Sequence, residues 1–114
     1  MILKKNKIGF IQGRLTRQKK KIQQFPHHNW KRELQLAKKL KINLIEWTID
    51  HYGFYNNPLL DLNYVESIKR ATSKNKIKIN SVTADFFMEK PFWKQKNSFY
   101  HLKKLELLIK FCGL

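Results

Sequence analysis

The chain has 114 residues, the size of one domain, and 42% of them are hydrophobic, which suits a globular core. It carries 24 Lys and Arg against 8 Asp and Glu, a formal net charge of +16 that would attract anionic partners. The lysines are interleaved with Asn and Ile, as in proteomes with AT-rich codons, so a dedicated nucleic-acid surface is disfavoured. The single cysteine, Cys112, excludes an internal disulfide and indicates a cytoplasmic location, and no apolar run reaches the ~20 residues of a membrane helix.

Three short apolar runs recur along the chain, and each is followed by polar residues. The runs start at Lys7, Asn43 and Ile77, which are 36 and then 34 residues apart. Helix-like stretches separate them, so the spacing predicts three parallel strands near 7–12, 43–47 and 77–82, each followed by a helix. The expected fold class is therefore α/β, with ligands at the carboxyl ends of the strands.

Each of the three expected helices has an apolar stripe at helical spacing. The first runs from about Asn29, a candidate N-cap, to Leu40. The second begins at Asn63, with Glu66 three positions later as in a capping box, and the third begins near Ser98. The side chains expected to be buried are Trp30, Leu34, Ala37 and Leu40 in the first helix, Tyr64, Ile68 and Ala71 in the second, and Leu102, Leu105, Ile109 and Cys112 in the third.

Half of the acidic residues follow the second and third strands. Glu46 and Asp85 stand at the strand ends and are the better candidates for substrate binding, whereas Asp50 and Glu89 lie further into loops. The alternative is structural, with Glu46 and Asp85 pairing with Arg14 or capping helices. Alternation along the strand places Trp47 on the face opposite Glu46, against the helices.

The exit of the first strand, Gln12-Gly13-Arg14, is the other candidate site. Gln12 can hydrogen-bond hydroxyl groups, and Arg14 can bind a phosphate or carboxylate through two parallel bonds. Gly13 permits a tight turn. The alternative is an ordinary turn with a solvated arginine. The four histidines do not have the spacing of a zinc motif, so no metal ligand is assigned.

Six segments in this order resemble one known family. They are IGFIQGRLT at 8–16, FP at 25–26, WxxELxxA at 30–37, IEWTID at 45–50, NPLL at 57–60 and SVTADFFM at 81–88. Together they resemble the sugar phosphate isomerase/epimerase family, the xylose-isomerase-like TIM barrels, whose superfamily also contains endonuclease IV. The resemblance spans nearly the whole chain and corresponds to the amino-terminal part of the family's barrel.

The resemblance implies a (β/α)₈ barrel of which residues 1–114 form about three βα units. It implies a divalent metal and proton transfer on a sugar or sugar phosphate. In such enzymes later strands supply most metal ligands, so this chain alone is expected to hold no metal and to need a carboxyl-terminal half or self-association. What carries over is the wall of the substrate pocket, and no catalytic residue is assigned. The expected substrate-binding residues are Gln12, Arg14, Glu46 and Asp85.

Two other functions stay open. One is a basic βα protein that binds nucleic acid or a partner chain without catalysis, which salt-sensitive DNA binding would favour. The other is a DNA-repair relative of endonuclease IV, which uses histidines for a zinc cluster, including some near the end of its third strand. Thr83-Ala84-Asp85 contains no histidine, so this second alternative is the weaker one.

Overall fold

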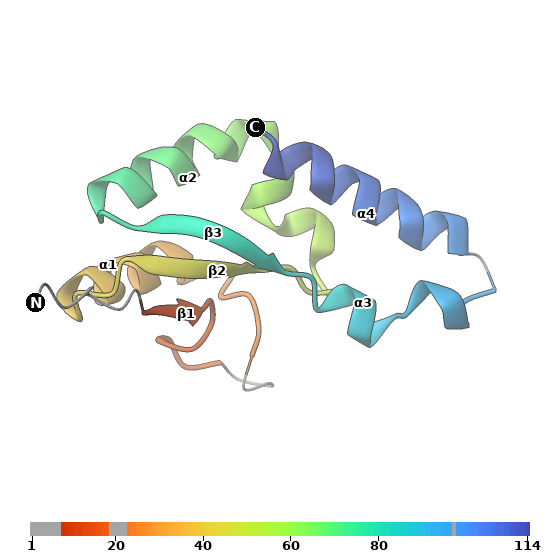
Figure 1. Ribbon diagram of the computed structural model, residues 1–114, viewed down its shortest axis with the longest axis horizontal. Coiled ribbons are helices and arrows are strands. Elements are labelled where there is room, and N and C mark those ends of the chain that lie inside the picture. Colours follow the sequence, from red (N-terminus) through yellow and green to blue (C-terminus); the bar gives the residue numbers. More distant parts are fainter. Residues whose placement is uncertain (1–7, 19–22, 97) are drawn as a thin grey trace, which may run out of the picture.

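The computed structural model describes residues 8–18, 23–96 and 98–114, and the protein is of the mixed α/β class. Strands alternate with helices along the described chain (Figure 1). Three short 3₁₀ turns, η1 (Phe54–Asn56), η2 (Pro58–Leu60) and η3 (Phe92–Lys94), lie in the loops. The main elements are β1 (Gly9–Ile11), α1 (Trp30–Lys39), β2 (Leu44–Thr48), α2 (Leu62–Lys74), β3 (Lys78–Thr83), α3 (Phe86–Glu89) and α4 (Ser98–Cys112).

The three strands form one sheet in the order β1-β2-β3, and both pairings are parallel. Ile11 lies opposite Glu46 in the register, and Trp47 lies opposite Val82. An irregularity between Ile45 and Glu46 shifts the pairing with β3 by one residue. The prediction of three parallel strands is confirmed, although Lys7, at the start of the first predicted strand, lies outside the described residues.

One face of the sheet, here called the covered face, packs against the helices. Ile45 and Trp47 of β2 are almost completely buried there, and Trp47 is 0% exposed. They share one core with Leu34 of α1, Ile68 of α2 and Phe111 of α4. The indole Nε1 of Trp47 donates to Asn57 Oδ1 at 2.9 Å, so this large side chain is buried without an unsatisfied donor. The predicted position of Trp47 under the helices is confirmed.

The opposite face of the sheet, here called the open face, carries the side chains that alternate with the core residues. Most of these positions are partly or fully exposed, but Thr48, at the end of β2, is 0% exposed and is hydrogen-bonded to Gln12. Burial on one face and exposure on the other is unusual for a parallel sheet, which normally has cover on both faces. The open face is formed by Gly9, Ile11, Leu44, Glu46, Ser81 and Thr83.

The same helix-to-strand connection occurs twice. After α1, Lys41 adopts a left-handed conformation with φ 59°, and the Ile42 N–H bonds to the Ala37 carbonyl at 2.9 Å. After α2, Lys76 has φ 54°, and the Ile77 N–H bonds to the Thr72 carbonyl at 2.9 Å. Both are Schellman-type helix ends, in which a left-handed residue lets the chain turn back along the sheet. The two βα units therefore end in the same way before each new strand.

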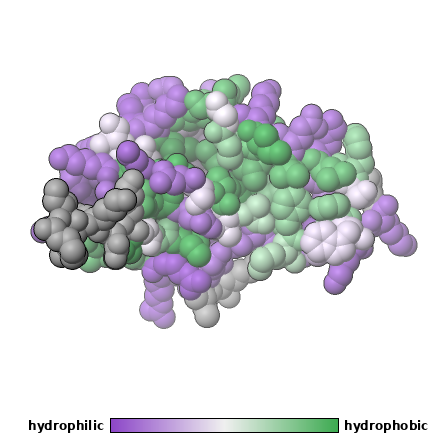
Figure 2. Space-filling view, in the orientation of Figure 1, coloured by the Kyte–Doolittle hydropathy of each residue, from purple (hydrophilic) through white to green (hydrophobic). Residues whose placement is uncertain are grey.

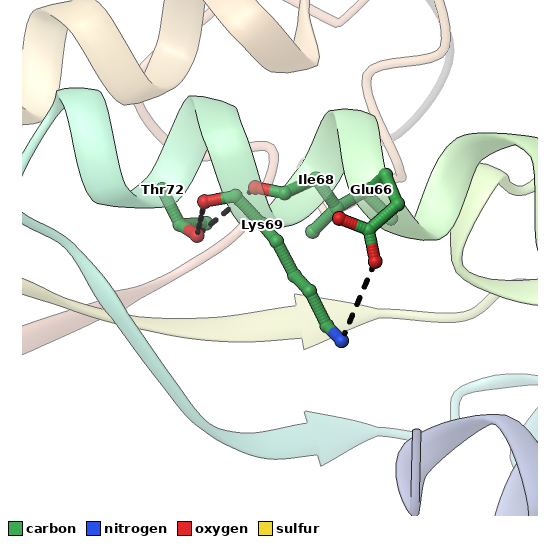
Figure 3. Close-up of polar contacts among 4 residues, drawn as sticks. All are labelled: Glu66, Ile68, Lys69 and Thr72. Carbon is green, nitrogen blue, oxygen red and sulfur yellow. Dashed lines mark hydrogen bonds and ion pairs between the residues drawn. The ribbon is translucent and has the colours of Figure 1, made fainter.

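Helix α2 begins differently from the prediction. Asp61, not Asn63, is the N-cap, and its carboxylate accepts the Asn63 N–H at 2.9 Å. Glu66 therefore does not close a capping box but pairs with Lys69 at 3.7 Å, as Figure 3 shows. In the same view the Thr72 hydroxyl donates to the Ile68 carbonyl at 2.9 Å, which accommodates a β-branched polar residue inside the helix.

Helix α4 buries a different stripe from the predicted one. The buried side chains lie one position earlier than expected, and Leu102, Ile109 and Cys112 are exposed. One of the buried residues is Lys104, which is 4% exposed and whose ammonium lies 5.1 Å from the ring centres of both Phe54 and Tyr100. These cation–π contacts stabilise a lysine on the inward side of the helix. The buried residues of α4 are His101, Lys104, Leu108 and Phe111.

Two further predicted core positions are exposed. Leu40 directly follows α1 and is 59% exposed, and Tyr64 lies in the first turn of α2. The buried inner side of α1 includes a carboxylate, that of Glu33. The predicted bounds of α1 are confirmed to within a residue, but Asn29 makes no side-chain capping bond.

The molecule is elongated and exposes more surface than a compact domain. Its principal extents are 54 × 32 × 31 Å, and its radius of gyration is 15.2 Å against roughly 13 Å expected for this length. Its accessible surface is 8550 Å² against roughly 6,600 Å² expected for this mass. Figure 2 shows hydrophobic side chains gathered over one half of the molecule and hydrophilic ones along its edges. No helix in the described part of the chain is both long and apolar enough to cross a membrane.

Candidate functional site

The exit of β1 is fixed to helix α1 by a buried carboxylate. Glu33 accepts the Gly13 N–H at 2.7 Å and the Thr16 hydroxyl at 3.1 Å. Gly13 has φ +92°, and a Cβ there would collide with the carbonyl oxygen of Gln24, so this turn requires glycine. Burial raises the pKa of Glu33, and the hydrogen bonds from the loop oppose that shift only in part. The predicted tight turn at Gly13 is confirmed.

Gln12 lies between two strand ends instead of at the surface. Its side chain is 0% exposed, and its Oε1 accepts the Thr48 N–H at 3.1 Å. The Thr48 hydroxyl donates to the Gln12 carbonyl at 3.1 Å. The amide therefore joins β1 to β2, and it presents no atom to solvent in this conformation.

Glu46 is the one predicted site residue that projects from the open face. Its Oε2 accepts the Ser81 hydroxyl at 2.8 Å, and its Oε1 accepts the Thr83 hydroxyl. These bonds, that of Thr83 first and that of Ser81 second, lower the pKa of Glu46. A shallow cavity of about 310 Å³, lined in part by Glu46, Leu44 and Ser81, lies over this face. The carboxylate is thus anionic, oriented and accessible.

Arg14 and Asp85 are linked through a residue that the sequence analysis did not single out. Gln23 donates from Nε2 to Asp85 Oδ2 at 2.7 Å, and its Oε1 accepts from Arg14 Nη2 at 3.1 Å. Asp85 occupies the N-cap position of α3 but makes no side-chain capping bond. The glutamine thus connects the loop after β1 to the end of β3. The structure brings these two predicted residues together, and separately places Glu46 with Ser81 and Thr83.

The two acidic residues in loops have structural contacts. Asp50 is buried, and its Oδ2 accepts the Phe25 N–H at 2.7 Å, which ties the loop after β1 to the end of β2. Glu89 Oε1 accepts the His51 N–H at 3.4 Å. Both carboxylates thus hold loop backbone in place, as their positions within loops suggested.

The residues do not fit a divalent metal. Within 8–18, 23–96 and 98–114, no group of three or more His, Cys, Asp or Glu side chains is close enough to hold one. Glu46 is surrounded by hydroxyl groups, which are weak metal ligands compared with carboxylates and imidazoles. No chemical step through a metal is derived from this arrangement.

The geometry around Glu46 is suited to binding hydroxyl groups. An ionised carboxylate fixed by two hydroxyls can accept further hydrogen bonds from a polyol, and such charge-assisted bonds are strong. A lowered pKa makes Glu46 a poor general base near neutral pH, where a group of pKa close to 7 is most effective. The site is therefore better suited to recognition than to proton transfer.

Three of the residues that build this arrangement had only weak signals in the sequence. Ser81 and Thr83 alternate along the third strand, as residues on one face do, and Glu33 interrupts an apolar helix stripe. Gln23 had no signal in the sequence.

No protein-family model, curated protein or solved structure matches this chain.

Proposed function

We propose that this chain forms the first three βα units of a (β/α)₈ barrel of the sugar phosphate isomerase/epimerase type, and that its open face binds a sugar or sugar phosphate. The observation that carries the proposal is the Glu46 carboxylate, held by Ser81 and Thr83 at the carboxyl half of a parallel sheet. Polar groups at that end of a barrel face the substrate.

The strand order agrees with a barrel. The three strands follow one another in chain order, as they do in a barrel and also in one half of a doubly wound sheet. In a barrel, consecutive strands are neighbours, helices form the outer ring, and alternate residues point inward. On this assignment Trp47 occupies an outward position and Glu46 an inward one.

The large exposed surface supports the proposal that further structural units pack against the sheet. Both β1 and β3 have an unpaired edge within the described sheet, and such edges favour association with further strands. We assign these edges to further βα units, from the same barrel polypeptide or from a second copy. The proposed metal and proton-transfer groups of the family would belong to those units. The proposed location is the cytoplasm, where the exposed thiol of Cys112 would stay reduced.

Calorimetric titration with a panel of unphosphorylated aldoses and ketoses tests the proposal. We expect Glu46→Gln to weaken binding about tenfold or more, because a hydrogen bond to a charged group contributes about 1.5–3 kcal/mol. Thr83→Val should weaken it less, since the carboxylate loses one of its two supports. Glu66→Gln is the matched control, because it removes the same charge from an exposed position on α2. Equal affinities for the wild-type chain and Glu46→Gln would refute the assignment.

A basic βα protein that binds nucleic acid is the second candidate, and the net charge of +16 is the observation that favours it. It predicts binding to an oligonucleotide whose affinity falls steeply with salt. That binding should be insensitive to Glu46→Gln, so the same variant separates the two functions.

A further inference from the structure

A second cavity lies away from the open face, between the loop after β1 and the loop after β2. Its volume is about 710 Å³, within the range of small-molecule sites. Three of its lining residues, Arg17, His27 and His28, carry cationic or imidazole groups, and none of the described residues that line it has a carboxylate. This composition contrasts with the open face, whose central group is a carboxylate. Tyr52, which is 76% exposed, adds an aromatic ring to the wall.

The imidazole of His27 is held in place by the surrounding loops. Its ring meets that of Phe25 edge-on at 4.8 Å, and Phe25 is anchored through its N–H to Asp50. On the other side lies Gly53, which has φ +70°, and a Cβ there would come within 2.8 Å of His27 Nε2. The positive φ and this close approach both favour glycine at position 53. The wall is formed by two loops that fit each other closely.

The amino-terminal end of helix α1 borders the same cavity. Asn29, the residue before the helix, lines the cavity and makes no side-chain capping bond. The first N–H groups of a helix carry partial positive charge and favour anions. The partial positive charge at this end of the helix has the same sign as the cationic side chains of the cavity and adds to their attraction for an anion.

We propose that this cleft binds a small phosphate monoester, with the phosphate group at Arg17, His27 and His28 and the organic part near Tyr52. An arginine binds a phosphate through parallel hydrogen bonds, and imidazole N–H groups supply further donors. The volume exceeds what a phosphate ion alone would fill, which favours a monoester over free phosphate. The inference does not depend on the function proposed for Glu46.

The protonation of His27 is consistent with such a ligand. Burial, followed by the charge of His28, lowers the pKa of His27. Arg17 and Tyr52 are the other titratable groups that line the cleft. A neutral imidazole still donates one N–H, and a bound anion would favour the charged form of His27.

Calorimetric titration of the full chain with phenyl phosphate tests this site, because that monoester has no sugar hydroxyl groups. We expect Arg17→Gln to weaken binding about tenfold to a hundredfold, the usual effect of losing a charged hydrogen-bond partner. Arg70→Gln, which removes the same charge from the exposed side of α2, is the control and should change the affinity less than about twofold. His28→Gln provides a second variant in the cleft and should also weaken binding.

Three results would overturn the assignment. Equal losses of phenyl phosphate affinity in Arg17→Gln and Arg70→Gln would mean that the overall charge of +16, not this cleft, attracts the ligand. Binding of inorganic phosphate as tight as that of phenyl phosphate would exclude a site for the organic part. Displacement of phenyl phosphate by an oligonucleotide at far lower concentration would indicate a nucleic-acid surface. Glu46→Gln should leave phenyl phosphate binding unchanged, so failure of the open-face proposal and failure of this one are distinguishable.

Discussion

Two glutamate carboxylates, one on the covered side of the sheet and one on the open side, lie in opposite environments. On the covered side, Glu33 is completely buried, and burial raises its pKa although several loop groups hydrogen-bond to it. On the open side, Glu46 is accessible, and two hydroxyl groups lower its pKa. The comparison shows that the first carboxylate serves the fold, by holding the turn at Gly13, whereas the second is kept charged and available.

The largest difference between the faces should appear in stability. Trp47→Ala removes a side chain that is 0% exposed and contacts Phe25 and Trp30, and it should lower the free energy of unfolding by about 3–5 kcal/mol. Thr83→Ala on the open face is the control and should cost less than about 1 kcal/mol. Urea unfolding followed by circular dichroism measures both. Similar losses in the two variants would mean that the open face is packed in solution.

The buried carboxylate of Glu33 should have the next largest effect. Glu33→Ala leaves the Gly13 N–H and the Thr16 hydroxyl without their acceptor, which should cost about 1–3 kcal/mol. Glu33→Gln retains one acceptor oxygen and should cost less. Chemical denaturation checks the order, and a loss no larger than that of the exposed control Glu66→Ala would contradict the role of Glu33 in holding the turn.

The two carboxylates should also give pH dependences of opposite sign. A raised pKa in the folded state means that Glu33 contributes stability below its usual value of 4.5, and that this contribution is lost as the pH rises through the folded pKa. A lowered pKa means that Glu46 contributes stability above 4.5, and that this contribution is lost as the pH falls through the folded pKa.

Unfolding free energies measured across the acidic range test these signs. Glu33→Gln should remove a component of stability that falls with rising pH, and Glu46→Gln should remove a smaller component that rises with pH. The contribution of Glu46 is the smaller one because solvent screens an accessible carboxylate. The same sign of change in both variants would mean that the two environments do not differ as described.

The smallest expected effect concerns the repeated helix ends. Lys41 and Lys76 have left-handed backbone conformations, which cost a non-glycine residue about 1–2 kcal/mol. Glycine avoids this cost, but it loses more conformational entropy on folding, which cancels part of the gain. Lys41→Gly and Lys76→Gly should therefore each stabilise the protein by about 0.5–1 kcal/mol. Lys39→Gly, at the last residue of α1, where the backbone is right-handed, should destabilise it and serves as the control. Thermal unfolding would contradict the Schellman assignment if all three variants behaved alike.

Periodicity predicted the strands and helices because it reports local geometry and burial. The alternation at Ile45, Glu46 and Trp47 predicts both faces of the sheet. The predicted stripe of α4 was wrong by one position, because Lys104 packs against Phe54 and Tyr55, which come from another part of the chain. A cation–π contact between distant segments has no periodic signature in the sequence.

The candidate site was predictable only in part. The positions of Glu46 and Asp85 at strand ends were predictable from the sequence. Their hydrogen-bond partners were not, because these depend on how segments from different parts of the chain come together. The link from Arg14 through Gln23 to Asp85 joins residues up to 71 positions apart in the chain. The burial of Gln12 similarly depends on the pairing of β1 with β2. Residue type and spacing do not contain that information.

The most direct test of the account is to locate sugar binding on one face of the sheet. Backbone amide shifts in a two-dimensional nitrogen–proton NMR spectrum can be followed during titration with unphosphorylated aldoses and ketoses, which avoid the cationic cleft. The account predicts that the largest shifts occur at Glu46, Ser81 and Thr83, and that they disappear in Glu46→Gln. Shifts confined to covered-face residues such as Trp47, or shifts that persist unchanged in Glu46→Gln, would contradict it.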